Sequence, residues 1–416
     1  MTEQHESPDN TPDRTRRKQA SPRKVLLWVI VTVAVGYVLY GVAPWILPAR
    51  LYEGPLVQMA TEDGVTLVWY TTRPVECIVA VTVDGTERIE RAVADGNRNI
   101  VRVDGLAPGT AYDYEIRVDQ RAISENLKFL TNQADERRYS FIVFGDSGRG
   151  TPAQYELAAD MTHAQPAPEL LLHTGDIVYS GGGRHKYNER FFTPYRNLIS
   201  RVNFWPCLGN HEIDDDGHAE PYQEVFEVPA NGPAGLPEDF NYWFDYAGSR
   251  FAVIDTNADE TILRDKVAPW LIEVMSDPMP RWKFVAFHHP PYTGGKYKPD
   301  ERVQRALVPA LDQADVDVVF SGHDHGYERT HPLRGGKIVE PGQGVTYIIT
   351  AAAGARLYEP KSPCPEYIAI LNHDVYSYTQ ITILDDQLTL RQIAMGGSAI
   401  DELILNKPAT TMETTP

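Results

Sequence analysis

Phe141-Ile142-Val143-Phe144-Gly145-Asp146-Ser147-Gly148 is an apolar run of strand type that ends in a glycine and a carboxylate. Similar apolar runs lie further along the chain at 170–172, 251–254, 284–287, 316–320 and 345–350. Longer mixed segments separate these runs, and the patterns at 270–275 and 303–314 are helical. Strands that alternate with helices predict a layered α/β fold whose strand ends deliver loops to one edge.

Five short polar motifs occur in order within this region, and most of them follow an apolar run. They are Gly145-Asp146-Ser147-Gly148, Gly175-Asp176-Ile177-Val178-Tyr179, Gly209-Asn210-His211-Glu212, His288-His289-Pro290 and Gly322-His323-Asp324-His325. Taken alone, each motif has an ordinary explanation, since Gly-Asp is usually a turn and His-His-Pro is often only a loop. Five in order are hard to explain as independent turns, so we interpret them as parts of one site.

The motif side chains offer two carboxylates, one amide, one phenol and three imidazoles, with no thiolate. A mixed set of oxygen and nitrogen donors suits hard and borderline transition metals. These donors suffice for two adjacent ions only if one carboxylate bridges them. The sequence therefore predicts a two-metal site.

The five motifs resemble those of the calcineurin-like metallophosphoesterases. Tyr179, three residues after Asp176, resembles the tyrosine that marks the purple acid phosphatases within that group. The run His323-Asp324-His325-Gly326-Tyr327-Glu328-Arg329 is similar to the family's as well. The resemblance implies an α/β fold, namely the calcineurin-like metallophosphoesterase β-sandwich flanked by helices, and a hydrolase of the acid phosphatase type.

The resemblance also implies a role for each donor. One metal ion, expected to be Fe(III), would be bound by Asp146, Asp176, Tyr179 and His325. The second, a divalent ion of Fe, Zn or Mn, would be bound by Asp176, Asn210, His288 and His323, with Asp176 as the bridge. A metal-bound hydroxide would attack a phosphate monoester, since two adjacent metals clamp an in-line phosphoryl displacement.

His211, next to Asn210, is expected to protonate the leaving alkoxide, with a purely structural histidine as the alternative. Family members carry a further substrate-contacting histidine about nine residues after the position of His288, where this chain reads Lys296-Tyr297-Lys298. Lys296 or Lys298 would bind phosphate as a point charge or lie on the surface. His289 would face the substrate or lie behind the ligands, so these three are candidate substrate-binding residues.

Two other functions remain open. A phosphodiesterase or nucleotide pyrophosphatase would use the same metal site, but diesterase relatives generally lack the ligand that Tyr179 supplies. A surface binding module with an inactive phosphatase fold is the alternative that is not an enzyme. Inactive relatives lose ligands, whereas all of the ligands are present here.

Residues 51–133 have an all-β pattern. The runs 65–70, 77–83 and 112–118 are typical of strands, with a turn at Asp84-Gly85. Trp69 and the run Leu-x-Pro-Gly-Thr-x-Tyr-x-Tyr at 106–114 resemble a fibronectin type III-like domain. We expect this domain to be a spacer. Polar residues at 133–138 would join it to a metallophosphoesterase domain at 139–405, which a disordered tail at 406–416 would follow.

The N-terminus predicts a membrane anchor. Residues 1–24 form a polar, basic tail, and 25–48 carry no charge. The apolar core of this stretch, about 19 residues, would span roughly 28 Å as a helix, enough to cross a bilayer. The positive charges that precede it place the N-terminus in the cytoplasm and the catalytic domain outside, in the periplasm or at the cell surface. A cleaved signal peptide is the alternative, although its apolar region would be shorter.

The chain has 416 residues and a net charge of -18, which argues against nucleic-acid binding because phosphate backbones need a basic face. The acidity does not argue against a phosphate-ester substrate, since bound cations invert the local field. The three cysteines, Cys77, Cys207 and Cys364, are too widely spaced to indicate a thiolate metal site, and a Cys207–Cys364 bridge stays open.

Overall fold

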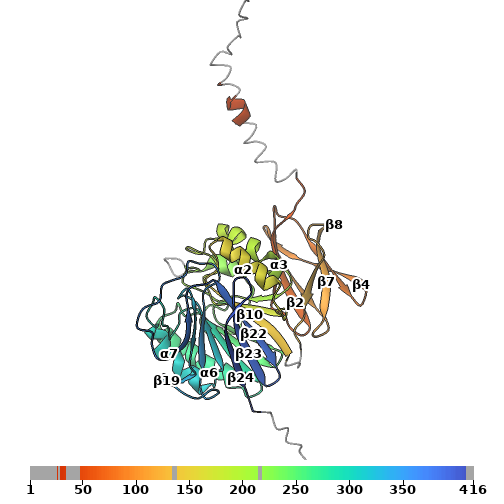
Figure 1. The fold of residues 1–416 in the computed structure, drawn as a ribbon. Helices are drawn as coiled ribbons and strands as arrows, with labels where there is room; N and C mark the ends of the chain where they lie inside the picture. The colour runs from red at the N-terminus through yellow and green to blue at the C-terminus, as the bar shows by residue number, and fades with distance from the viewer. Residues whose placement is uncertain (1–25, 27–28, 34–46, 134–137, 214–217, 409–416) are drawn as a thin grey trace, which may run out of the picture. The chain divides into compact units, whose positions relative to one another are not determined.

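The computed structural model describes residues 26, 29–33, 47–133, 138–213 and 218–408. Residues 50–416 form one unit and residues 1–49 another. Within the larger unit, the chain as far as Leu130 contains β-strands alone among its described elements. From Arg138 onward, strands alternate with helices (Figure 1).

Two antiparallel sheets form the all-β part. Their orders are β1–β2–β6–β5 and β4–β3–β7–β8, and β9 also pairs with β7. The strands are β1 Leu51–Gln58, β2 Gly64–Thr71, β3 Ile78–Val83, β4 Thr86–Arg91, β5 Val93–Asp95, β6 Arg98–Asp104, β7 Ala111–Val118, β8 Arg121–Ala122 and β9 Leu127–Leu130. Trp69 is fully buried on β2. Asp84 and Gly85 both have positive φ, as the two-residue turn between β3 and β4 requires.

Two larger sheets and a small ribbon form the remainder. Their orders are β12–β11–β10–β22–β23–β24 and β13–β14–β15–β16–β20–β17–β21, with β18 paired to β19. The strands are β10 Arg138–Phe144, β11 Leu170–His173, β12 Asn203–Trp205, β13 Tyr242–Tyr246, β14 Ser249–Ile254, β15 Trp282–Phe287, β16 Val318–Ser321, β17 Tyr327–Thr330, β18 Leu333–Arg334, β19 Lys337–Ile338, β20 Thr346–Thr350, β21 Ile368–Asn372, β22 Ser377–Leu384, β23 Gln387–Ala394 and β24 Ala399–Asn406. The helices are α2 Pro152–Thr162, α3 Thr193–Ile199, α4 Glu220–Val225, α5 Glu260–Ile262, α6 Ala268–Met275 and α7 Glu301–Gln313, with the short helical turns η1 Arg184–Lys186, η2 Asn188–Phe192 and η3 Leu263–Val267.

The central strands of both large sheets are buried on two faces, which is why they read as unbroken apolar runs. In β10, Phe141 packs in the core between the sheets, whereas its neighbour Ile142 packs with residues of α2 and α3. In β14, Phe251 faces the core between the sheets and Ala252 packs with residues of α6 and α7. This two-residue alternation gives four layers, two of helices outside two of sheet (Figure 1). The predicted layered α/β fold is therefore confirmed.

Parallel pairing brings the motif loops to one edge of each sheet. Strands β10, β11 and β12 are parallel neighbours in one sheet, and β14, β15, β16 and β20 are parallel neighbours in the other. The loops that carry Asp146, Asp176 and Asn210 follow the first three strands. Those that carry His288 and His323 follow β15 and β16. Because the carboxyl ends of parallel strands share an edge, motifs that are distant in sequence meet there.

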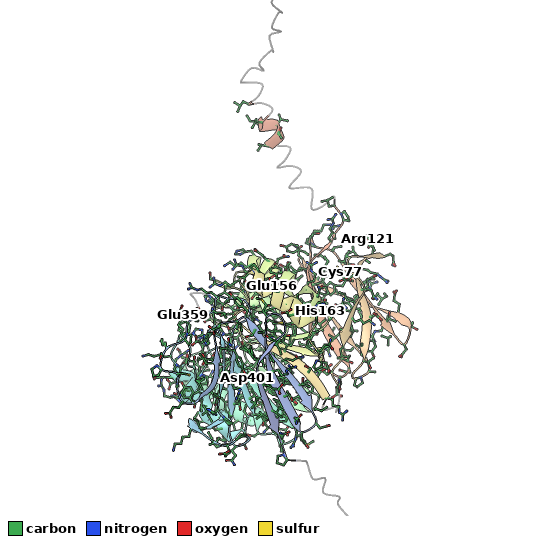
Figure 2. All side chains as sticks on the ribbon, in the orientation of Figure 1. Cys77, Arg121, Glu156, His163, Glu359 and Asp401 are labelled. Atoms are coloured by element: carbon green, nitrogen blue, oxygen red, sulfur yellow. The ribbon has the colours of Figure 1, made fainter. Side chains whose placement is uncertain are left out.

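The stretch after the last motif ties the two large sheets together. Asp401 on β24, labelled in Figure 2, accepts hydrogen bonds from Arg329 Nε at 2.6 Å and from the Tyr327 hydroxyl at 2.7 Å. Both donors lie on β17, in the other sheet. The Tyr-Glu-Arg stretch at 327–329, noted above for its resemblance, therefore has a structural role in this chain.

The predicted anchor at 25–48 lies mostly outside the described residues, and the basic tail at 1–24 lies entirely outside them. In the part of the chain that the structure describes, no helix is long and apolar enough to cross a membrane. The anchor and the extracytoplasmic location stay predictions. Residues 134–137 of the predicted linker and 409–416 of the predicted tail are likewise outside the described ranges, whereas Asn406 still belongs to β24. Cys207 is buried, Cys364 is exposed and both thiols are free, so they form no bridge.

An ion pair joins the all-β part to the α/β part. Glu53 in β1 accepts hydrogen bonds from Arg184 at 2.5 and 3.2 Å, and only 2% of its side chain is exposed. The Arg184 guanidinium also pairs with Glu224 at 2.7 Å and lies 4.2 Å from the centroid of the Tyr70 ring. Because an unpaired buried charge is costly, this contact favours one packing of the two parts.

Replacing Glu53 with alanine removes the buried partner of Arg184, and we expect the free energy of unfolding to fall by about 2–4 kcal/mol. Urea denaturation of the purified chain measures this loss. The control is Glu301→Ala, because Glu301 also pairs with an arginine but its side chain is 72% exposed. That change should cost less than about 1 kcal/mol, and equal losses in the two variants would contradict the prediction.

Candidate metal centre

Tight backbone turns aim the donor side chains into one crevice. Asp146, Asp176 and His323 each follow a glycine and have positive φ values of 55°, 54° and 70°. A Cβ atom on Gly322 would lie 2.5 Å from Asp146 Oδ2. One on Gly209 would lie 2.2 Å from Asp176 Oδ1. Only glycine permits so close an approach, which explains the glycines in these motifs.

One group of donors surrounds Asp146. The Tyr179 hydroxyl lies 2.9 Å from Asp146 Oδ1 and 2.9 Å from His325 Nε2. His325 Nε2 is also 3.3 Å from Asp146 Oδ1. Asp176 joins this group, since ligand atoms of Asp146, Asp176 and His325 all lie within 4.8 Å of one another. All four residues are buried.

A second group of donors surrounds Asn210. Asn210 Oδ1 lies 3.1 Å from His288 Nε2 and 3.0 Å from His323 Nδ1. His288 Nε2 is also 3.4 Å from Asp176 Oδ1. Asp176 therefore contacts both groups, which is the position that a bridging carboxylate needs. The structure thus brings all seven predicted donors together.

Two backbone carbonyls decide which imidazole nitrogens face the site. The Thr174 carbonyl lies 2.9 Å from His288 Nδ1, and the Arg356 carbonyl lies 2.7 Å from His325 Nδ1. A carbonyl only accepts hydrogen bonds, so each Nδ1 carries a proton and each Nε2 is left to face the acidic oxygens. Nitrogen and oxygen lone pairs that face each other at 3.3–3.4 Å need a proton or a metal cation between them. The donor set therefore fits a pair of metal ions.

Burial favours the neutral form of two of the imidazoles. It lowers the pKa of His323 to about 4, an effect to which neighbouring His288 contributes, and it lowers the pKa of His289 well below its usual value. Neutral imidazole is the form that coordinates metals. At His325, burial opposes protonation, but the adjacent Asp146 carboxylate raises the pKa above its usual value. The Asp146 carboxylate thus favours positive charge beside His325, as the facing lone pairs of these two residues also do.

His211 lies at the edge of the site. Its Nε2 is 3.9 Å from Asp176 Oδ2, and its ring lies 4.6 Å from the Tyr179 ring. Its backbone N–H donates to Asp176 Oδ1 at 3.0 Å, which fixes His211 beside this carboxylate. The His211 side chain is 33% exposed, so it is accessible to a substrate.

The three candidate substrate-binding residues differ in position. His289 Nδ1 lies 2.9 Å from Thr256 Oγ1, behind the ligands, although its ring is 4.8 Å from that of His323. The Lys296 ammonium lies at the rim, 4.0 Å from the centroid of the Tyr358 ring. Lys298 is exposed. Within the described part of the chain its side chain makes no hydrogen bond, ion pair or ring contact, so Lys296 is the better placed of the two lysines.

Glu212 ends the motif at 209–212, but the sequence predicted no role for it. Its buried carboxylate accepts hydrogen bonds from the backbone N–H groups of Asp176 and Gly209, both at 2.9 Å, and from Val178 at 3.0 Å. Burial and the nearby Asp176 charge raise its pKa to about 8. Glu212 therefore holds two ligand-bearing loops in register. Only its place next to Asn210 and His211 in the sequence could have drawn attention to it.

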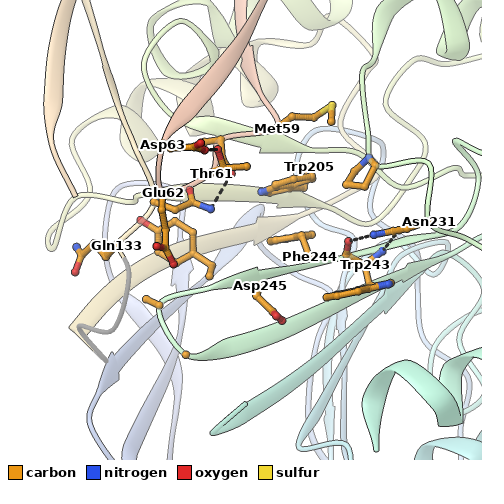
Figure 3. A pocket seen from close by; sticks show the side chains of 16 residues that line it. Met59, Thr61, Glu62, Asp63, Gln133, Trp205, Asn231, Trp243, Phe244 and Asp245 are labelled. Atoms are coloured by element: carbon orange, nitrogen blue, oxygen red, sulfur yellow. Dashed lines mark hydrogen bonds between the residues drawn. The ribbon is translucent and has the colours of Figure 1, made fainter. Parts of the chain in front are cut away.

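One cavity of the described chain is separate from this site. It has a volume of about 630 Å³ and is lined by the turn between β1 and β2, by Trp205 and by the hairpin of β13 and β14 (Figure 3). None of the candidate metal donors lines it. The donor cluster, rather than this cavity, is therefore the candidate active site.

The fold and the donor set resemble those of the calcineurin-like phosphoesterases. Residues 139–327 match the family model of the calcineurin-like phosphoesterases, so the chain carries a domain of that family. Residues 48–134 match the model of a domain of unknown function, DUF7800.

The homologues of the chain include purple acid phosphatases. Probable inactive purple acid phosphatase 9 of Arabidopsis thaliana is 26% identical over 309 residues, which is 62% of this chain and 47% of that protein. Purple acid phosphatase 23 of the same plant is 29% identical over 274 residues, 56% of this chain and 57% of that protein. The chain thus spans about half the length of these relatives. The structure of purple acid phosphatase PPD1 from yellow lupin seeds shares the fold, with a TM-score of 0.73, 19% identity and coverage of 87% of this chain and 74% of that one.

The sequence also predicted no role for His173, which makes hydrogen bonds to two of the turns that carry donors. It accepts a hydrogen bond at Nδ1 from the Gly175 backbone N–H at 3.1 Å, so its proton lies on Nε2, 3.0 Å from Ser147 Oγ. The imidazole is fully buried, and this burial lowers its pKa from 6.5 to about 3.

We expect His173 to make the metal-free protein less stable in acid. Below pH 6.5 the unfolded chain binds a proton that the folded chain refuses until about pH 3, so stability falls as the pH decreases through this window. The loss from this group by pH 5 is about 2 kcal/mol. Urea denaturation at pH 7.5 and pH 5.0 should show a smaller difference for His173→Gln than for the wild type. His163→Gln, which changes an exposed histidine, should keep the wild-type difference, and equal behaviour of both variants would contradict the assignment.

Proposed function

We propose that the chain hydrolyses phosphate monoesters with a pair of metal ions held by the donor cluster. The observation that carries the proposal is the set of buried lone pairs, from His288, His325 and the two aspartates, that face one another across 3.3–3.4 Å. Such a cluster would attract cations, because buried carboxylate oxygens and imidazole nitrogens are donors that metal ions prefer. Homology to purple acid phosphatases supports the same reaction, although some of these relatives are named inactive.

The proposed ligand sets follow the two groups of donors. Asp146, Asp176, Tyr179 and His325 would bind one ion, which we propose to be Fe(III) because a phenolate is a hard anionic donor. Asp176, Asn210, His288 and His323 would bind a divalent ion of Fe, Zn or Mn. When bound, the two ions would supply Lewis acidity toward the phosphate and lower the pKa of an attacking water molecule.

The remaining steps belong to side chains at the rim. His211 would donate a proton to the leaving oxygen, since it is accessible and lies beside Asp176. Burial lowers the pKa of His211, so the histidine carries its proton mainly at acidic pH, as an acid phosphatase needs. Lys296 would attract the phosphate as a point charge.

Two further proposals concern the rest of the chain. The two-sheet arrangement and the hydrogen bond from the Ala107 N–H to the Tyr112 hydroxyl, 2.8 Å long, support a fibronectin type III-like domain at 51–133. The basic residues before the apolar stretch at 25–48 support a single-pass anchor that places the catalytic domain outside the cytoplasm.

The central test is metal analysis combined with hydrolysis of para-nitrophenyl phosphate across the pH range. Asparagine tolerates the same backbone turn as aspartate. In Asp176→Asn we therefore expect the metal content to fall and kcat/KM to drop by at least about 100-fold. Asp385→Asn is the matched control, since Asp385 has a similar backbone conformation but a side chain that is 60% exposed on a distant turn. A metal-loaded wild type that leaves the substrate intact at every pH would refute the proposal. Hydrolysis of bis-para-nitrophenyl phosphate alone would favour a phosphodiesterase.

The leaving group tests the role of His211. In His211→Asn, we expect kcat for an alkyl phosphate to fall by about 10²–10⁴-fold, because an alkoxide needs a proton to leave. The loss for para-nitrophenyl phosphate should be much smaller, since nitrophenolate leaves without one. Steady-state kinetics on the two substrates measure the difference. Equal losses on both would indicate that His211 positions Asp176 instead.

A further inference from the structure

Two tyrosine rings cover the imidazoles of two proposed ligands, one from each donor group. Tyr358 stacks on His325 with the ring centroids 4.0 Å apart and an angle of 10° between the planes. Tyr297 stacks on His323 at 4.6 Å, and the two tyrosine rings meet edge to face at 5.5 Å. A stacked ring restricts the rotation of the imidazole that it covers, so the groups that fix the two tyrosines also fix the donor atoms of both ligands.

The backbone of Tyr358 is held on both sides of its ring. Its N–H donates to the His325 carbonyl at 3.0 Å, and its own carbonyl lies 3.0 Å from Nδ1 of His373. His373 directly follows β21, and Gly326 lets its ring approach the loop at 322–326, because a Cβ atom on that glycine would lie 2.3 Å from His373 Cδ2. Tyr358 is therefore tied to a ligand on one side and to a buried histidine on the other.

His373 is paired with a buried carboxylate. Nε2 of its ring lies 3.1 Å from Glu328 Oε1, and the two side chains are only 1% and 2% exposed. Because the Tyr358 carbonyl can only accept a hydrogen bond, Nδ1 of His373 carries a proton. In a neutral ring the lone pair of Nε2 would then face a carboxylate oxygen, so one further proton must lie between the two side chains. Burial opposes a charged imidazole, but the hydrogen bond and the charge of Glu328 raise the pKa of His373 above its usual value, in keeping with that proton.

Glu328 connects His373 to the loop at 293–297. Its two neighbours on β17 reach Asp401 in the other sheet, so the Glu328 side chain points to the opposite face of the strand. Its Oε2 accepts a hydrogen bond from the Gly294 N–H at 2.6 Å. The carboxylate thus contacts His373 with one oxygen and this loop with the other.

A second carboxylate continues the network to Tyr297. Thr293 Oγ1 lies 3.0 Å from Glu328 Oε1 and 2.8 Å from Asp324 Oδ2, between the two buried carboxylates. Asp324 accepts a hydrogen bond from the backbone N–H of Tyr297 at 3.0 Å. The buried pair is therefore connected to one tyrosine by a backbone carbonyl, and to the other through Thr293 and Asp324.

We propose that Glu328 and His373 share one proton and act as positioning residues of the metal centre. Neither residue touches an ion or a substrate in this role. Through the two tyrosines they align His325 and His323, one imidazole from each donor group, before any ion binds. The inference rests on the proposed function for its consequence, which is metal affinity, whereas the alignment of the imidazoles is a property of the metal-free chain.

The alignment is tested on the metal-free full chain by nuclear magnetic resonance of isotope-labelled histidines. The ring current of Tyr358 should displace the Cε1–H resonance of His325, which is assigned by its loss in His325→Asn, from its position in Tyr358→Leu. In Glu328→Gln we expect the wild-type position, because the amide N–H donates to His373 while the amide oxygen still accepts from the Gly294 N–H.

The double variant Glu328→Gln/His373→Leu differs from that conservative change only at the histidine. It leaves no unpaired charge in the interior, and urea denaturation confirms that it folds. In this variant we expect the His325 resonance to move toward its position in Tyr358→Leu.

Calorimetric titration with Zn²⁺ alone measures the consequence for the metal centre. The Kd should rise by about 10–100-fold in the double variant and in Tyr358→Leu, because the groups that orient a ligand are lost. It should stay within about threefold of the wild type in Glu328→Gln and in Tyr358→Phe, since the first keeps the hydrogen bonds and the second keeps the stacked ring.

The outcomes separate this inference from the proposed function. A His325 resonance or a Zn²⁺ affinity that the double variant leaves unchanged would overturn the positioning role. A Glu328→Gln chain that behaves like the double variant would overturn the shared proton. A wild type that binds no Zn²⁺, but whose His325 resonance responds as expected, would refute the proposed function alone and support the positioning role.

Discussion

The site depends on one electrostatic constraint: acceptor atoms from two different sheets are buried facing one another. Asp146 and Asp176 lie in loops that follow strands of the six-stranded sheet, and His288 and His325 lie in loops that follow strands of the seven-stranded sheet. Without positive charge between them, these groups would repel across the layer boundary at which the sheets meet. The cluster that would bind cations therefore also destabilises the fold when no cations are bound.

Several buried groups oppose this destabilisation by holding the loops in position. Glu212 accepts hydrogen bonds from three backbone N–H groups in two of the turns. His173 makes hydrogen bonds to the turns that carry Asp146 and Asp176. Asp324 does the same for the loop at 293–297 on the other side. None of these residues is a proposed ligand. Because each is buried with its hydrogen bonds satisfied, the geometry of the site is largely set before any ion arrives.

The sequence was sufficient for the layered fold and for the polar side chains that meet at the sheet edges, because both leave local signals. Strands buried on two faces read as apolar runs, and a glycine before a polar residue marks a sharp turn. The sequence could not show that Tyr358 stacks on His325, since Tyr358 lies in no motif and reaches the site only through the tertiary fold. The stacking of Tyr297 on His323 was hidden as well, because stacking geometry leaves no pattern in the sequence. The β12 strand before Asn210 was missed as well, because three residues are too few for a periodic signal.

The pairing of β10 with β22 places Phe141 opposite Ile381, so the central strand of the first large sheet obtains a partner from almost the far end of the chain. Contacts of such long sequence separation form slowly, because a long loop must close before they are made. During synthesis, Asp146 therefore leaves the ribosome well before β22, the strand that pairs with β10. Assembly of the donor cluster therefore has to await nearly the whole polypeptide.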